Sequence, residues 1–249
     1  MPQPDVRIYP NLDELSRAAA RVFSERAERV LETKGIFFAA LSGGTTPRRL
    51  YELLASPSIR LPWDKIHLFQ VDERCVPPDS PESNYGMVRA AFLSRTSFPE
   101  ANFHRIKGER LDREAAAREY AEELAHAMGV KPGVWPRFDL ILLGMGPDGH
   151  TASLFPDSPG LNERTRWVCP NFSERLKAER LTLTLPVLNA AAEIIFLVAG
   201  GDKAETLRAV LKGSVADAGL PASLVVPARG SVTWLVDETV ARLLDRAPH

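Results

Sequence analysis

Apolar and polar residues follow two patterns along the chain. One is typical of amphipathic helices and the other of strands, and the two alternate. From Asn11 to Thr33 the apolar residues recur every three to four positions, as in a long amphipathic helix. Short runs rich in apolar residues predict strands. These runs are Ile36–Leu41, Ile66–Val71, Phe138–Leu143, Arg180–Leu185, Ile194–Ala199 and Val232–Val236. The other segments that predict helices or helical turns are Pro47–Leu54, Asn84–Leu93, Asp112–Met128, Pro186–Ala192, Asp202–Leu211 and Glu238–Arg246.

Strands separated by helices predict the α/β class. The arrangement favours an open, mostly parallel, Rossmann-like sheet with helices on both faces, because right-handed crossovers place the helices there. No internal repeat, low-complexity tract or linker divides the 249 residues. We therefore expect residues 1–249 to form a single α/β domain.

The composition and charge of the chain indicate which kinds of binding partner are to be expected. The net charge is −1 and no long block of like charge occurs, so no nucleic-acid partner is expected. Every apolar stretch is far shorter than the ~20 residues of a membrane helix, and no charged-then-apolar leader opens the chain. Cys75 and Cys169 cannot form a disulfide framework and lack zinc-ligand spacing. These features predict a cytoplasmic protein with no membrane partner and no structural metal.

Unusual polar residues follow four of the predicted strands. The segments are Ser42–Pro47, Asp72–Arg74, Gly144–Pro156 and Gly200–Lys203. The carboxyl ends of parallel strands lie along one edge of a sheet, and ligands of open α/β sheets bind there. We therefore expect the four segments to surround one cleft.

The first segment has the composition of an anion site. Gly43 and Gly44 permit a tight turn with exposed amides, Thr46 can cap the following helix, and Pro47 suits its first turn. Free amides at a helix N-terminus favour phosphate. The same pattern is also typical of a plain N-cap after a glycine turn. It matches neither the P-loop nor the dinucleotide fingerprint.

Two cations are candidates for the same anion. Lys203 lies in the first turn of its predicted helix, where the macrodipole opposes a cation by roughly 0.3–1 kcal/mol, and an anion between them would explain its place. Arg180 opens a predicted strand and can offer a bidentate fork. The alternatives are a solvated lysine beside a capping Asp202, and a basic loop that also contains Arg175 and Lys177.

Two further strand ends carry acid–base groups. His150 lies among glycines, where an imidazole that exchanges protons near neutral pH favours function over a structural role. Asp148 can orient it, although their spacing does not guarantee a contact. Asp72 and Arg74 follow a buried strand, and Asp72 alone is also typical of a turn.

Together these motifs resemble the sugar-phosphate isomerase and lactonase superfamily, and within it the 6-phosphogluconolactonase family. The resemblance covers nearly the whole chain. It rests on Ser-Gly-Gly-Thr-Thr-Pro at 42–47, Asp-Glu-Arg at 72–74, Ser83-Asn84, the motif at 143–156, Arg180, and Gly201-Asp202-Lys203. It implies an open α/β fold, hydrolysis of 6-phosphogluconolactone to 6-phosphogluconate in the pentose phosphate pathway, and no metal or organic cofactor.

The resemblance also implies roles. His150 is the expected general base, Asp148 its orienting partner, and Arg74 the group that stabilises the carbonyl oxygen or binds ring hydroxyls. Asp72 is expected either to bind sugar hydroxyls or to act as a second acid–base group. The residues expected to hold the 6-phosphate are Ser42, Gly43, Gly44, Thr45, Arg180 and Lys203. The expected partner is a phosphorylated sugar lactone, and the expected assembly a monomer or weak homodimer.

Two other functions are weighed against this one. Glucosamine-6-phosphate deaminases resemble the chain in the phosphate turn, Asp72 and the Asp-Gly-His core, but continue with Ala-Phe-Asn-Glu-Pro. Here Ala152–Pro156 contains no carboxylate, and Arg74 stands where the deaminases usually carry an aromatic residue. A non-catalytic sugar-phosphate sensor would use the same cleft. It would need an output module, for which no spare segment is seen.

Overall fold

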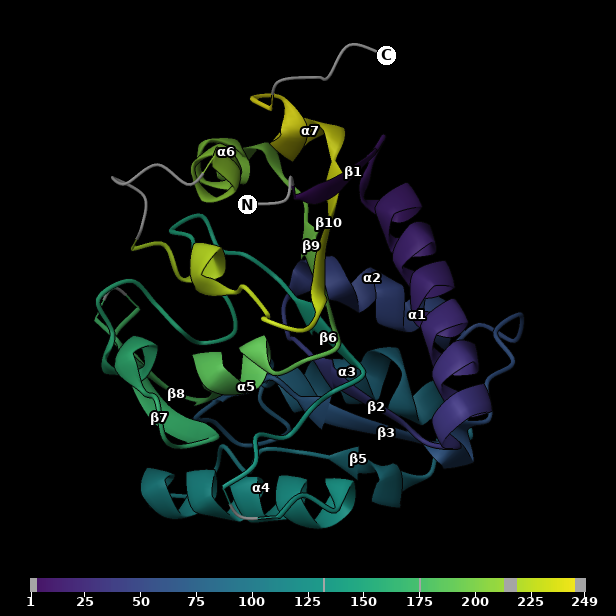
Figure 1. The fold of residues 1–249 in the computed structure, drawn as a ribbon, viewed down its shortest axis with the longest axis vertical. Helices are drawn as coiled ribbons and strands as arrows, with labels where there is room; N and C mark the ends of the chain where they lie inside the picture. The colour runs from purple at the N-terminus through teal and green to yellow at the C-terminus, as the bar shows by residue number, and fades with distance from the viewer. Residues whose placement is uncertain (1–3, 132, 175, 213–218, 245–249) are drawn as a thin grey trace.

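A seven-stranded sheet with only parallel neighbours forms the centre of the molecule (Figure 1). The computed structural model describes residues 4–131, 133–174, 176–212 and 219–244. The strand order is β1-β10-β9-β6-β2-β3-β5. The strands are β1 Asp5–Tyr9, β2 Phe37–Leu41, β3 Ile66–Gln70, β5 Phe103–His104, β6 Leu140–Leu143, β9 Glu193–Val198 and β10 Ser231–Asp237. The sheet confirms the expected open α/β, Rossmann-like class.

A second, antiparallel sheet lies beside the first. It has three strands in the order β4-β8-β7, with bounds β4 Asp72–Arg74, β7 Val168–Ser173 and β8 Ala178–Leu183. Leu181 and Leu183 of β8 belong to the core on one face of the main sheet. The small sheet therefore covers part of that face, as the helices do elsewhere.

Helices cover both faces of the main sheet. They are α1 Leu12–Lys34, α2 Thr45–Leu54, α3 Asn84–Ala91, α4 Arg113–Met128, α5 Leu185–Asn189, α6 Ala204–Lys212 and α7 Glu238–Ala241. Buried side chains of α1, α2 and α3 form one core. Those of α4, α5, α6 and α7 form the other, together with the small sheet. In Figure 1, α1 lies to the right of the main sheet and the small sheet to the left.

The two cores follow from the side-chain alternation of the strands. In β2, Phe37 and Ala39 enter the core of α1–α3, whereas Phe38 and Ala40 enter the opposite core. All five β2 residues are buried. A strand buried on both faces has no polar positions, which explains its continuous apolar run.

The crossovers change face between β6 and β2. The helix after β2, α2, packs in one core, whereas α5 and α6, which follow β6 and β9, pack in the other. Neighbouring loops that diverge to opposite faces leave a crevice at the carboxyl ends of their strands. The topology therefore places a cleft between the loops after β2 and β6.

The positions of several strands differ from the sequence predictions. The segment predicted at Arg180–Leu185 is β8, a strand of the small sheet rather than of the parallel sheet. Asp72–Arg74 is itself the strand β4 instead of a loop after a strand. The pattern also missed β1, which is largely exposed, β5, which has two residues, and β7, which mixes polar residues and a proline with apolar ones.

Helix boundaries also differ. Gly44, with a φ of 104°, is the N-cap of α2, so the expectation that Thr46 caps this helix is wrong. Residues Gly201–Lys203 form a 3₁₀ turn before α6, so Lys203 precedes the α-helix. The last helix ends at Ala241, and positions 245 and 246 of its expected range lie outside the described residues.

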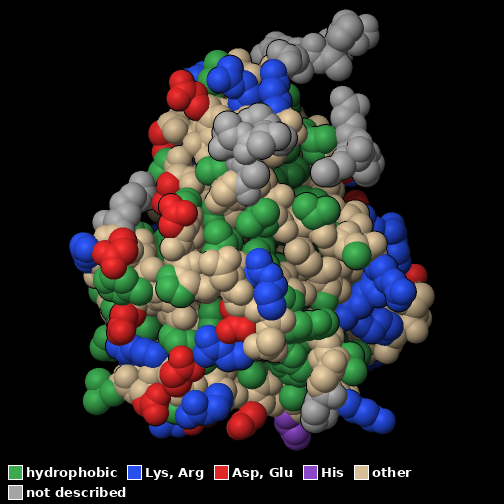
Figure 2. Space-filling model, turned by 60° about the vertical axis from the view of Figure 1, so that its left-hand side comes forward, with side chains coloured by type: hydrophobic (Ala, Val, Ile, Leu, Met, Phe, Trp, Pro, Cys, Tyr) green, Lys and Arg blue, Asp and Glu red, His purple; other side chains and the backbone are tan. Residues whose placement is uncertain are grey.

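Charged side chains of both signs are interspersed over the lower part of the face shown in Figure 2. Ion pairs among the described residues include Arg113 with Glu179 and Arg166 with Glu114. Within the described ranges, no helix combines the length and apolar composition needed to cross a lipid bilayer.

A buried histidine pair joins β3 to β5. His67 Nδ1 lies 2.9 Å from His104 Nε2, and His104 Nδ1 lies 2.6 Å from Glu123 Oε1 on α4. His104 also stacks on Phe69 at 4.2 Å. Burial, followed by the neighbouring His104, lowers the pKa of His67.

The histidine pair predicts a loss of stability in acid. Since the folded state lowers the pKa of His67, the unfolded chain binds more protons once the pH falls below its ordinary value of about 6.5. Urea unfolding at pH 7.5 and 5.5 should show a smaller acid-induced loss in His67→Asn than in the wild type. His126→Asn, at an exposed site on α4, is the control and should behave as the wild type. Equal losses in all three proteins would contradict the prediction.

Candidate active site

The four strand-end segments meet around one cavity of about 200 Å³. It lies at the carboxyl ends of the adjacent strands β9, β6, β2 and β3, at the crevice described above. Its lining includes most of the predicted site residues: Ser42, Gly43, Gly44, Thr45, Asp72, Arg74, His150 and Lys203. Asp148 and Arg180 are not part of this lining, but Asp148 hydrogen-bonds to His150 and Arg180 pairs with Arg74 across the small sheet.

The loop after β2 presents an uncapped helix end to the cavity. Gly44 makes no side-chain cap to α2, so the first amides of the helix are not used by a capping side chain. Tyr51 on α2 donates from its hydroxyl to the Ser42 carbonyl at 2.7 Å and fixes the start of the loop. Ser42 Oγ is buried without a hydrogen-bond partner among the described residues. These donors converge where an anion could bind.

Gly43 lies against Asn84 of α3. A Cβ on Gly43 would lie 1.8 Å from Asn84 Oδ1, so only glycine allows this approach. Asn84 also lines the cavity. The glycine turn of the segment Ser42–Pro47 is therefore packed against Asn84, the first residue of α3.

Lys203 reaches the cavity from the 3₁₀ turn after β9. Gly200, with a φ of 101°, makes the preceding bend, and its amide donates to the carboxylate of Asp237 at 3.2 Å. Lys203 makes no ion pair within the part of the chain that the structure describes. Lys203 and the N-terminus of α2 line the same cavity, and both bring positive charge to it.

Asp148 and His150 form a hydrogen-bonded pair in the loop after β6. Asp148 Oδ1 lies 2.5 Å from His150 Nδ1 and also accepts the His150 amide at 3.3 Å. Because a carboxylate only accepts, the proton of the neutral imidazole lies on Nδ1, and Nε2 is left with a free lone pair. The Phe155 ring packs beside the imidazole at 4.8 Å.

Backbone contacts hold this loop in shape. Gly146 donates its amide to the His150 carbonyl at 2.9 Å, and Thr151 Oγ1 donates to the Gly144 carbonyl at 2.8 Å. Thr206 on α6 donates to the Pro147 carbonyl at 2.6 Å. The loop therefore places the imidazole without relying on the strand that precedes it.

Asp72 is buried at the cavity wall. Its Oδ2 accepts from Ser153 Oγ at 2.6 Å, and its backbone carbonyl accepts from Asn84 Nδ2 at 2.9 Å. The remaining oxygen, Oδ1, has no described hydrogen-bond donor. Asp72 can therefore accept a hydrogen bond from a ligand hydroxyl.

Arg74 and Arg180 lie directly opposite each other on β4 and β8. Arg74 Nη1 donates to the Glu82 carbonyl at 2.5 Å, and Arg180 Nη1 donates to the Glu179 carbonyl at 3.0 Å. Burial and then the charge of Arg74 lower the pKa of Arg180. Neither guanidinium pairs with a carboxylate among the described residues, so the two add positive charge to the rim.

Sequence reasoning did not assign two residues that the structure places here. Asn84 lines the cavity, and Ser153 holds Asp72. Both belong to motifs already quoted, Ser83-Asn84 and the segment at 143–156, but their polar partners come from other strands. Only the folded arrangement links them to the site.

Neither cysteine lines the cavity. Burial raises the pKa of Cys75 to about 11 and that of Cys169 to about 12, so both remain thiols near neutral pH. In the described ranges, no group of three or more His, Cys, Asp or Glu side chains is placed to hold a metal ion.

The family model described as glucosamine-6-phosphate isomerases/6-phosphogluconolactonase matches residues 10–234. The chain is 41% identical to a protein of Synechocystis sp. named 6-phosphogluconolactonase, over 94% of this chain and 96% of the relative. It is 40% identical to the human protein of the same name, over 96% of this chain and 93% of that protein. This chain belongs to the glucosamine-6-phosphate isomerase/6-phosphogluconolactonase family, as its motifs indicated.

Solved structures agree with this placement. The 6-phosphogluconolactonase from Trypanosoma cruzi superimposes with a TM-score of 0.87 at 30% identity, covering 97% of both chains. A monomeric glucosamine-6-phosphate deaminase gives a TM-score of 0.80 over 96% of this chain and 99% of that chain, at 24% identity, which shows a shared fold alone.

The close packing of Gly146 predicts a selective effect on His150. A Cβ on Gly146 would lie 2.2 Å from His150 Nδ1 and 2.9 Å from Asp148 Oδ1, whereas a Cβ on Gly144 would meet nothing within 4 Å. Gly146→Ala should shift the His150 imidazole signals in ¹⁵N–¹H spectra and lose the hydrogen-bonded Nδ1 proton. Gly144→Ala should leave both unchanged. Identical imidazole spectra in the two variants would show that the pair is not held as described.

Proposed function

We propose that this chain hydrolyses 6-phospho-D-glucono-1,5-lactone to 6-phosphogluconate, a carboxylic ester hydrolysis of the pentose phosphate pathway. The observation that carries the proposal is the Asp148–His150 pair in a cavity that also contains the uncapped N-terminus of α2. One end of the cavity offers a base and the other an anion site. The names of the relatives above support the same reaction.

The phosphate would bind at the end of the cleft formed by the loop after β2. We assign Ser42, Gly43, Gly44 and Thr45 to it, through the free amides of the turn and the unpartnered Ser42 hydroxyl. Lys203 adds a cation from the opposite wall, and we also assign Arg180, from the rim beside Arg74. Binding at this remote group fixes the lactone carbonyl relative to the base, which lowers the barrier as well as KM.

His150 is then the general base. Its Nε2 accepts a proton from a water molecule while the water oxygen attacks C1 of the lactone, and the carbonyl electrons move to the oxygen. When the C1–ring oxygen bond breaks, the imidazolium returns the proton to the leaving ring oxygen, which gives the open-chain acid. Asp148 holds the imidazole through Nδ1 and stabilises its charged form between the two steps.

Two further residues complete the assignment. Arg74 lies at the cavity wall and would stabilise the oxyanion at C1 or bind ring hydroxyls. Asp72 would accept from a sugar hydroxyl through its free oxygen or act as a second acid–base group. A lactone is already an activated ester, so these groups suffice without a ring-opening acid.

One experiment separates the three functions. Purified protein should release acid from freshly generated 6-phosphogluconolactone faster than buffer does, and should release no ammonium from glucosamine 6-phosphate. Acid release at the buffer rate would favour a sugar-phosphate sensor. Ammonium release would favour a deaminase, despite the absence of a carboxylate at Ala152–Pro156.

Replacing His150 should lower kcat without weakening the binding of phosphate. His150→Ala should lower kcat by ~10²–10⁴ because proton transfer to the base is lost. Inhibition by inorganic phosphate should stay close to the wild-type value, since the anion site lies elsewhere in the cavity. His126→Ala, at an exposed position on α4, is the control. A kcat that stays at the wild-type value in His150→Ala would remove His150 from the base role.

The phosphate assignment predicts the opposite pattern for Lys203. Lys203→Ala should raise KM by more than it lowers kcat, because the lysine contacts the phosphate rather than the reacting carbonyl. Steady-state kinetics over a wide lactone range measure both values. Lys65→Ala, at an exposed site before β3, should change neither. A wild-type KM in Lys203→Ala would exclude this lysine from the phosphate site.

We also propose that residues 1–249 act as one domain, because both cores share the same central sheet. A charged sugar phosphate does not cross membranes unaided, so we place the activity in the cytoplasm. The exposed large apolar side chains come from β1, the β7–β8 hairpin and separate loops, which supports a monomer or weak homodimer.

A further inference from the structure

A buried carboxylate lies directly behind the cleft. Glu73 is only 2% exposed and stands in β4 between Asp72 and Arg74. Its two neighbours line the cavity, whereas Glu73 does not. Successive residues of a strand point to opposite sides, so Glu73 turns toward α3 and the end of β3.

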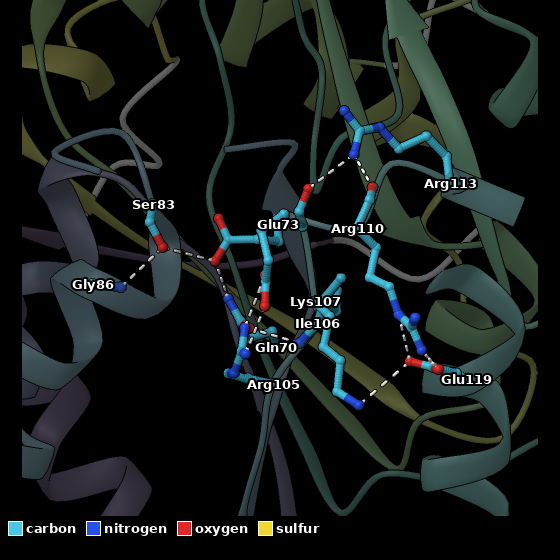
Figure 3. A network of polar contacts seen from close by, with 12 residues as sticks. Gln70, Glu73, Ser83, Gly86, Arg105, Ile106, Lys107, Arg110, Arg113 and Glu119 are labelled. Carbon is cyan, nitrogen blue, oxygen red and sulfur yellow. Dashed lines mark hydrogen bonds and ion pairs between the residues drawn. The ribbon is translucent and has the colours of Figure 1, made fainter. Parts of the chain in front are cut away.

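Glu73 accepts hydrogen bonds from three segments of the chain. Oε1 accepts the amides of Arg74 at 2.8 Å and Asn84 at 2.7 Å. Oε2 accepts from the Gln70 side chain at 2.8 Å, the Ser83 hydroxyl at 3.2 Å and the Tyr85 amide at 2.8 Å. Figure 3 shows Glu73 between Ser83 at the start of α3 and Gln70 at the end of β3. Glu73 forms no ion pair among the described residues, so hydrogen-bond donors surround its carboxylate at close range, and the Arg105 guanidinium interacts with it electrostatically from farther away.

The same network reaches a fourth segment. Gln70 Oε1 accepts the Ile106 amide at 2.8 Å (Figure 3). A Cβ on Gly108 would lie 2.2 Å from the Arg74 carbonyl and 3.1 Å from Glu73 Cγ. The chain after β5 therefore packs tightly against the back of β4, and β4 has little freedom to shift.

These contacts lead directly to the groups that face the ligand. The Asn84 amide is held by Glu73, and the Asn84 side chain donates to the Asp72 carbonyl and touches Gly43. The Arg74 amide is held by the same carboxylate, and its guanidinium donates to the carbonyl of Glu82, just before α3. The spacing between β4 and α3 thus sets where Arg74 and Asn84 lie in the cavity.

We infer that Glu73 is a positioning residue for the lactonase reaction, whose buried carboxylate fixes β4 to the N-terminus of α3 and thereby places Arg74 and Asn84 against the reacting end of the substrate. The inference rests on the proposed function. It requires a carboxylate rather than an amide, because donors surround both oxygens and an amide nitrogen in either place would face at least two of them.

The test is Glu73→Gln, with Glu163→Gln as the matched control. Glu163 also holds backbone amides of a loop, those of Arg164, Thr165 and Arg166, but does not line the cavity. Glu73→Gln should lower kcat for 6-phosphogluconolactone by about tenfold or more, since small displacements of positioned groups cost up to about 10²-fold. The inhibition constant of inorganic phosphate should stay within about twofold of the wild type, because Glu73 makes no hydrogen bond to the residues assigned to the phosphate. Glu163→Gln should keep wild-type kcat.

The possible outcomes distinguish a failure of the proposed function from a failure of the inference about Glu73. A wild type that does not accelerate hydrolysis would overturn the proposed function and this inference with it. An active wild type with an equally active Glu73→Gln variant would overturn the inference alone. Parallel loss of kcat and phosphate affinity in Glu73→Gln would overturn it too, because that pattern indicates general damage.

Two milder substitutions, Ser83→Ala and its control Asp112→Ala, test the inference if Glu73→Gln does not fold. Ser83→Ala removes one donor to Glu73 and the N-cap of α3, and Asp112→Ala removes the N-cap of α4 outside the cleft. Ser83→Ala should lower kcat severalfold at unchanged phosphate inhibition, whereas Asp112→Ala should not. Equal kcat values in these two variants would overturn the inference.

Discussion

The parallel pairing of β9, β6, β2 and β3 is the constraint on which the site depends. Because these strands run the same way, the loops that follow them emerge at one edge of the sheet. Residues as distant in sequence as Ser42 and Lys203 thereby line one cavity. The change of helix face between β2 and β6 opens the crevice between the loop proposed to bind the phosphate and the loop that carries His150.

Within that crevice, groups of different charge and chemistry line the cavity. The α2 N-terminus and Lys203 bring positive charge to the cavity, and the Asp148–His150 hydrogen bond orients the imidazole. Asp72 and Arg74 lie on β4 of the small sheet, which therefore forms the third side of the site. The loops of the main sheet carry the residues proposed for the phosphate and for the base, and the small sheet carries those proposed for the sugar and its oxyanion.

The sequence predicts the central strands and most helices well, because continuous apolar runs and 3.6-residue periods depend on local burial alone. The small sheet was not predictable in this way. Its β4 has three polar residues, and its pairing of Arg74 with Arg180 joins segments far apart in the chain. The candidate site residues could be chosen from strand ends, but the Asp148–His150 contact and the support of Asp72 by Ser153 depend on loop shape and on neighbouring strands.

The position of β1 has a consequence for how the protein is made. Among the described residues, Asp5–Tyr9 pairs with β10 alone, at Thr233–Asp237, so β1 cannot join the sheet before β10 has been synthesised. Pairing across such a separation closes a very long loop, and contacts of this kind form slowly. During synthesis β9 therefore presents an open edge, which β10 covers only after Lys203 has already been added. An open strand edge of this kind can pair with another molecule until its neighbouring strand covers it.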